Sequence, residues 1–351
     1  MSKSSNPWYM LLPLALVIFI ALAWSSYWYV SFTQTKQSYL EWAERAKRSG
    51  LNLECAEQSW GGYPFRVEMS CDAAHFSRIG MGTDMIITSR NITAVTQIYS
   101  PGLVIIQFTG PSSYDVNRAR GGVSISSAHS PAFASLKFRD KTPAEISILI
   151  ENLNGTLLAG EGPQAGKLNA ERLNLHGRFA GVPEGGKVSY DIAGVAKDFS
   201  YDGPQRDPVD GGPVSFDSFA FSANVSDVPY PWPDILGEIV SGWARNSGVL
   251  DIKQLDLTRT PMRASMSGNL KADGAGKLDG ELKGEIVNLN KLLDRLVSVG
   301  KLSKGEASLA KNMFRLLSGG GANGSVSTEL VIKQSKIYLG PFKIGEFAPL
   351  F

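Results

Sequence analysis

The sequence predicts a mainly β, α+β protein: an N-terminal transmembrane helix and a stalk, then a large curved antiparallel sheet with a few helices in its second half. Three observations predict this class. Residues 8–30 contain no charged side chain. After residue 50, short segments rich in β-branched residues alternate with turn residues, a spacing typical of hairpins and not of βαβ units. Helical periodicity returns only beyond residue 229.

Residues 8–30 form the predicted anchor, because a helix of about 20 apolar residues crosses a hydrocarbon core about 30 Å thick. Trp8 lies at one end of the run, and Trp24 and Trp28 lie near the other, as aromatic side chains do at membrane interfaces. A cleaved signal peptide is the alternative, since residues 21–23 have the small-x-small pattern. The low positive charge before the run and the aromatic cluster after it favour an anchor that stays attached.

The anchor divides the chain into five predicted segments. A helical stalk follows the span until Gly50, a natural helix stop. A proline-rich stretch near residue 229 separates two β-rich halves. The segments are a cytoplasmic tip (1–7), the anchor (8–30), the stalk helix (31–50), the first β-rich half (51–228) and the second β-rich half with helices (229–351).

The two cysteines indicate the compartment. Cys55 and Cys71 are the only cysteines and flank one compact aromatic stretch, so a disulfide in an exported domain is expected. Two buried free thiols in a cytosolic protein are the alternative. The basic residues after the span argue for a cytoplasmic domain, but long domains cross membranes regardless of such charges. We therefore expect a large periplasmic domain.

Composition excludes some classes of protein. The 35 basic and 33 acidic residues nearly balance and form no basic stripe, so nucleic acid is not an expected partner. Charged residues make up 19% and hydrophobic residues 43%, which is enough for a sizeable core.

The second half alternates strand and helix signals. Asp234 is expected to cap one helix, Asn290 a second, and the Ser303–Glu306 pair forms a capping box for a third. Between the first two helices, apolar residues and glycines alternate with charged residues over 277–286, as in a strand that is dry on one face. We expect Leu278, Leu282 and Ile286 to line an apolar groove.

Sequence motifs for catalysis, cofactors or metals are weak. The glycine-rich stretch 181–187 lacks the Ser/Thr of a phosphate-binding loop and leads into a strand, so it is interpreted as a hairpin turn. His75, His129 and His176 lie far apart in sequence and match no zinc or nucleophile spacing. No catalytic residue, cofactor or metal ligand is therefore predicted.

The segment between the cysteines is the most specific local feature. It contains a corner formed by Trp60, Gly61, Gly62, Tyr63, Pro64, Phe65 and Arg66. The glycines permit a tight reversal and the proline fixes φ. The aromatic rings are expected to pack over the disulfide. The corner either starts the sheet as a stapled turn or docks a partner or gates a ligand near the membrane.

This corner, the single span and the stalk resemble an uncharacterised single-span bacterial envelope family, domain of unknown function 2125. Residues 94–101 and 338–341 are similar to later stretches of that family. More distantly, the anchor and the repeated amphipathic strands resemble AsmA-like proteins, in which a curved sheet with an apolar inner face is thought to hold lipid. The resemblance implies the bacterial inner membrane, with the large domain in the periplasm.

We expect a protein without catalysis that binds or handles lipid or another apolar envelope component. The inner membrane is its expected partner, with lipid or envelope assembly proteins in addition. An interaction scaffold for envelope assembly, with a filled core, is the alternative. A hydrolase acting on the envelope ranks third.

Overall fold

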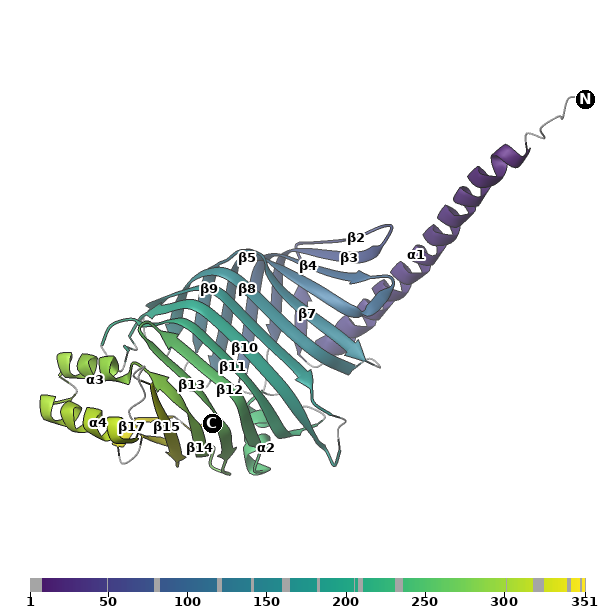
Figure 1. Cartoon of the computed structure of the whole chain (residues 1–351). Coiled ribbons are helices and arrows are strands. Elements are labelled where there is room, and N and C mark those ends of the chain that lie inside the picture. Colours follow the sequence, from purple (N-terminus) through teal and green to yellow (C-terminus); the bar gives the residue numbers. More distant parts are fainter. Residues whose placement is uncertain are drawn as a thin grey trace, which may run out of the picture.

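The protein is a long curved β-sheet with a helix at its N-terminal end, as the computed structural model shows (Figure 1). The helix α1 projects from one end of the sheet, and two short helices lie at the opposite end. The structure describes residues 8–48, 50–78, 83–118, 122–139, 142–159, 165–181, 184–204, 206–207, 211–230, 236–300, 302–317, 325–339, 342–347 and 349–350.

The elements follow the chain in the order expected of a β-meander. The helices are α1 (Trp8–Arg48), α2 (Leu236–Arg245), α3 (Leu289–Ser298) and α4 (Lys304–Leu317). The strands are β1 (Leu51–Glu54), β2 (Glu57–Gly61), β3 (Arg66–Arg78), β4 (Thr83–Gln97), β5 (Ser100–Arg118), β6 (Val123–Ala128), β7 (Ala132–Arg139), β8 (Thr142–Ala159), β9 (Ala165–Phe179), β10 (Lys187–Asp202), β11 (Val214–Pro229), β12 (Val249–Arg259), β13 (Met262–Ala272), β14 (Leu278–Val287), β15 (Ser325–Lys333), β16 (Lys336–Leu339) and β17 (Phe342–Glu346).

The described strands form one antiparallel sheet in which successive strands pair with each other. Two positions in the sheet are shared: β1 and β2 both pair with β3, and β6 and β7 both lie between β5 and β8. The predicted antiparallel β-rich fold is thus confirmed. The sheet also continues across the expected boundary at residue 229, because β11 pairs directly with β12.

Helix α1 joins the predicted anchor and the predicted stalk in one continuous helix of 41 residues. Among the described residues it is the one helix long and apolar enough to cross a membrane. Its C-terminal half contacts β1 and β3. Its N-terminal part extends away from the sheet (Figure 1).

Of the three helix caps expected in the second half, one is present, one is at another residue and one lies outside the described residues. The capping box at α4 is present: the Ser303 N–H donates to Glu306 Oε2 at 2.9 Å, and the Glu306 N–H donates to Ser303 Oγ at 3.2 Å. The residue before α3 is Asn288 and not Asn290, and its side chain makes no capping bond. Asp234, expected to cap α2, lies outside the described residues.

The main hydrophobic core lies between β11–β15 and the helices α3 and α4. The strand β14 has the predicted alternation, with Leu282 and Ile286 buried and their charged neighbours exposed. However, these two side chains are only 7% and 8% exposed and belong to one cluster with Leu289 and Leu293 of α3. Leu278 packs against the same cluster. The expected groove at Leu278, Leu282 and Ile286 is therefore a filled core, because α3 and α4 fold back over this end of the sheet.

Candidate functional site

One face of the sheet is apolar from its first strand to its last third. Directly paired residues of an antiparallel sheet point to the same face, so the strand register defines this face. We call it the apolar face. One row of paired residues on it is Trp60, Met69, Ala94, Ile106, Ala134, Ile148, Leu175, Gly194, Phe221, Leu255 and Met266. The adjacent row is Val67, Thr96, Val104, Leu136, Ile146, Gly177, Ile192, Ala223, Ile252, Gly268 and Leu282.

Helices cover the two ends of the apolar face. At the start, Trp60 packs edge-on against Phe32 and Tyr39 of α1, with ring centroids 6.3 and 5.3 Å apart. At the far end, α3 and α4 form the filled core, and Trp243 of α2 belongs to a second cluster with Val188 of β10. The helices contact chiefly β1, β3, β11, β13 and β15. The strands β4 to β9 lie between these covered ends.

The middle of the apolar face is exposed where a packed core would be closed. Leu175 is 47% exposed and Ile146 is 43% exposed, although both lie in the apolar rows. Their cross-strand neighbours Ile148 and Leu136 are half-buried. Burial raises the pKa of Tyr114 on the same face above its ordinary value of 10.0, against a smaller lowering by its hydrogen bond with Ser112. The middle of this face is therefore an apolar surface on which the large side chains Leu175 and Ile146 remain exposed.

The opposite face is mixed and carries cross-strand ion pairs. We call it the polar face. Its pairs include Arg172–Glu151 at 2.7 Å and Lys137–Glu145 at 3.2 Å. It also holds isolated exposed apolar residues such as Leu158, which is 40% exposed and lies opposite Ser124. Single exposed apolar residues of this kind are common on protein surfaces, whereas continuous apolar rows are not.

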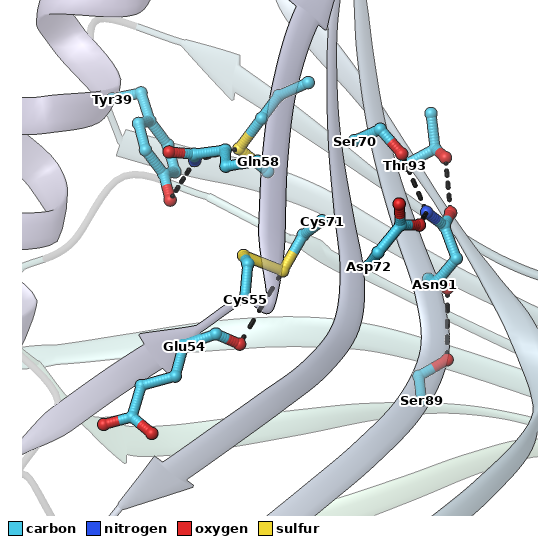
Figure 2. Close-up of a disulfide and its surroundings, with 11 residues drawn as sticks. Tyr39, Glu54, Cys55, Gln58, Ser70, Cys71, Asp72, Ser89, Asn91 and Thr93 are labelled. Atoms are coloured by element: carbon cyan, nitrogen blue, oxygen red, sulfur yellow. Dashed lines mark hydrogen bonds between the residues drawn. A yellow bond between two sulfur atoms is a disulfide. The ribbon is translucent and has the colours of Figure 1, made fainter.

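The disulfide lies at the β1–β3 end of the apolar face. Cys55 and Cys71 are bonded, as predicted, and Cys71 is fully buried beside Ile92 (Figure 2). Figure 2 also shows Tyr39 of α1 next to Gln58, whose amide donates to the Tyr39 hydroxyl at 3.1 Å. The disulfide therefore links the turn after β1 to β3 at the place where α1 contacts the sheet.

The aromatic corner was expected to pack over the disulfide, but it packs on α1. Trp60 ends the apolar face, with Lys36 Nζ 5.8 Å above its ring. Gly61 ends β2, and Gly62 has φ +106 with no room for a side chain, because a Cβ there would lie 2.6 Å from the Arg66 carbonyl oxygen. Arg66 opens β3 and pairs with Glu68 at 2.9 Å, as their shared face predicts.

Tryptophans of α1 hold the backbone of the corner. The indole N–H of Trp24 donates to the Pro64 carbonyl at 2.9 Å, and that of Trp28 donates to the Arg66 carbonyl at 2.9 Å. The ring of Trp28 lies edge-on to Tyr63 with centroids 5.3 Å apart, and the ring of Trp24 lies 5.9 Å from Phe65. The predicted corner is thus a docking point for the anchor helix.

A serine–histidine pair in which only the serine is buried was not predicted from the sequence. His129 Nε2 lies 3.0 Å from Ser112 Oγ, and His129 Nδ1 lies 2.6 Å from the Ser130 carbonyl oxygen. Because a carbonyl oxygen can only accept, Nδ1 donates to the Ser130 carbonyl. The hydroxyl of Ser112 also bonds Ser89, and Ser112 is only 3% exposed. The pair thus satisfies polar groups between the end of β6 and the start of β7.

The three histidines lie on different parts of the sheet. His75 lies on β3, and His176 on β9 bonds Ser147 at 2.6 Å, so the three histidines stay apart. Within the described ranges, no three His, Cys, Asp or Glu side chains come close enough together to hold a metal ion.

Comparison with known proteins identifies a family. The model of the family described as "Uncharacterized protein conserved in bacteria (DUF2125)" matches residues 28–348. The match includes the corner, the disulfide and nearly all of the sheet. No curated protein and no solved structure matches the chain.

Proposed function

The chain belongs to the bacterial family DUF2125, and on that premise we propose that it is a membrane-anchored periplasmic protein whose apolar face binds the acyl chains of lipids. The observation that carries the proposal is the continuity of the apolar rows through β4–β9, where no helix of the described chain covers them and Leu175 and Ile146 stay exposed.

The size of the uncovered face suits a lipid chain. Neighbouring strands are about 4.8 Å apart, so the five sheet positions from β4 to β9 span about 19 Å. One leaflet of a bilayer with a hydrocarbon core about 30 Å thick is about 15 Å deep. An acyl chain lying across the strands would therefore find apolar contacts along its whole length, which favours transfer of the chain from water to this face.

The shape of the face favours binding over catalysis. Its centre is lined by aliphatic side chains such as Ile148 and Leu175, which offer no group for proton transfer or nucleophilic attack. In the polar cluster around Ser112 on the same face, Ser112 itself is buried and only 3% exposed.

Photocrosslinking tests the proposal on the full-length protein in its membrane. A phospholipid with a diazirine in its acyl chain should label peptides of the apolar face between β4 and β9. Leu175→Asp should abolish this labelling, because a hydrated carboxylate at a 47% exposed position repels the chain without unfolding the sheet. Leu158→Asp is the matched control, since Leu158 is 40% exposed on the polar face.

Two results would overturn the proposal. The first is labelling that falls equally on both faces of the wild-type sheet. The second is undiminished labelling of Leu175→Asp, provided that its melting transition shows a folded protein. Both would favour the scaffold, in which a partner protein covers the middle of the face.

A further inference from the structure

Three large aromatic side chains are exposed together beside the anchor helix. Tyr63 and Phe65 lie in the turn between β2 and β3, and Tyr99 lies in the turn between β4 and β5. They are 59%, 60% and 64% exposed. The Ile98 N–H donates to the Phe65 carbonyl at 3.2 Å, so the two turns form one unit. We call these three residues the aromatic tip.

The position of the tip along α1 is fixed by hydrogen bonds. Besides the bonds from Trp24 and Trp28 to the β2–β3 turn, the Tyr27 hydroxyl donates to the Ile98 carbonyl at 3.2 Å. Ser25 Oγ lies 2.9 Å from the Tyr63 hydroxyl. Both turns are therefore held level with residues 24–28 of the helix.

Residues 24–28 belong to the last turns of the apolar run. With a rise of 1.5 Å per residue, Trp24 lies about 24 Å along the helix from Trp8. A hydrocarbon core is about 30 Å thick. The residues before Trp8 include Lys3, three serines and an asparagine. If the core begins near Trp8, its far boundary therefore falls beyond Trp24, at the level where the aromatic tip is attached.

The chemistry of the tip suits this depth. Tyrosine and tryptophan prefer the boundary between headgroups and acyl chains, because each has an apolar ring and a polar group. Arg66, next to the tip and 57% exposed at its side chain, can reach lipid phosphates. In water, three neighbouring exposed aromatic rings would be an unfavourable surface.

We propose that the aromatic tip is a second membrane contact, in which Tyr63, Phe65 and Tyr99 enter the periplasmic interface of the same bilayer that α1 crosses. This inference rests on the anchoring part of the proposed function. The contact fixes the sheet against the membrane at its β2–β3 end. Because Trp60 begins the apolar row, the end of the apolar face nearest the tip is then held beside the lipids that it would take up.

A fluorescent probe can measure this contact directly. Tyr99→Cys, labelled with an environment-sensitive NBD group, is placed in the full-length protein in vesicles of phosphatidylethanolamine and phosphatidylglycerol. Phe133→Cys is the matched control, because Phe133 is an aromatic residue, 38% exposed, on the polar face of β7. We expect blue-shifted emission and strong quenching by nitroxide lipids for the Tyr99 probe, and water-like emission for the Phe133 probe.

Phe65→Cys provides a second reporter on the other turn and should behave like the Tyr99 probe. Water-like emission from both tip probes would overturn the inference. Carbonate extraction and diazirine labelling of the same samples keep the two proposals apart. If the protein stays membrane-bound and binds lipid while the tip probes remain in water, only the tip proposal fails. If carbonate releases the protein, the anchoring proposal fails as well.

Discussion

Replacing Leu282 by alanine should destabilise the protein about three times more than replacing Leu175 by alanine. Leu282 is 7% exposed and packs in the cluster beneath α3 and α4, so its truncation leaves a cavity and should cost about 3 kcal/mol. Leu175 is 47% exposed, so truncation loses about half of a leucine transfer free energy and opens no closed cavity. The expected cost is about 1 kcal/mol.

Thermal unfolding of the full-length protein in detergent, followed by circular dichroism, measures the difference. A change of 1 kcal/mol shifts Tm by about 2–4 °C in domains of 150–250 residues. We therefore expect Leu282→Ala to lower Tm by about 6–12 °C and Leu175→Ala by about 2–4 °C. Equal losses would refute the reasoning, because they would mean that the middle of the apolar face is as tightly packed as its covered end.

Two further predictions concern the disulfide and the stability of the protein at acidic pH. Without reductant, a maleimide should label neither Cys55 nor Cys71 in the native protein. Cys71→Ser should lower the free energy of unfolding by about 3 kcal/mol, the loop-entropy value for a closed loop of about 15 residues. Full labelling would contradict both expectations. The Asp273 carboxylate accepts hydrogen bonds from the backbone N–H groups of Lys277 and Ala275, and the bond from Lys277 is the largest cause that holds the pKa of Asp273 below the ordinary 3.8. The stabilisation by the ionised carboxylate is present above pH 3.8 and is lost as the pH falls through the lower pKa of the folded protein. Asp273→Asn keeps an acceptor oxygen but cannot titrate, so this variant should lose less stability than the wild type on acidification below pH 3.8.

Local signals in the sequence predicted the local structure well. The disulfide, the capping box at Ser303 and the alternation of β14 depend on residues close together in the chain, so their patterns are visible in one window. The helix stop at Gly50 is of the same kind, with φ +79° and a hydrogen bond from its N–H to the Lys47 carbonyl.

Contacts between distant segments were predicted less well. The corner was expected to cover the disulfide, but its rings meet Trp24 and Trp28, which lie about 35 positions earlier in the chain. The pairing of Ser112 with His129 follows no known motif spacing. It arises because β5 and β6 are antiparallel and Ser112 lies opposite Ser127. His129 follows directly after β6 and is therefore brought close to Ser112.

The expected groove on β14 is a filled core, and the reason for this difference bears on the proposed function. Alternation shows which residues share a face, but it does not show what covers that face. Whether a face of the sheet is covered depends on where helices occur along the sequence. In the described parts of 83–179, strands are joined to strands with no helix between them, whereas α2, α3 and α4 follow β11 and β14 and can fold back on nearby strands. The helix α1 precedes β1 and can reach only the first strands. The chain thus brings its own covering segments to both ends of the apolar face, and the apolar rows of β4–β9 are left for the acyl chains that we propose as their ligand.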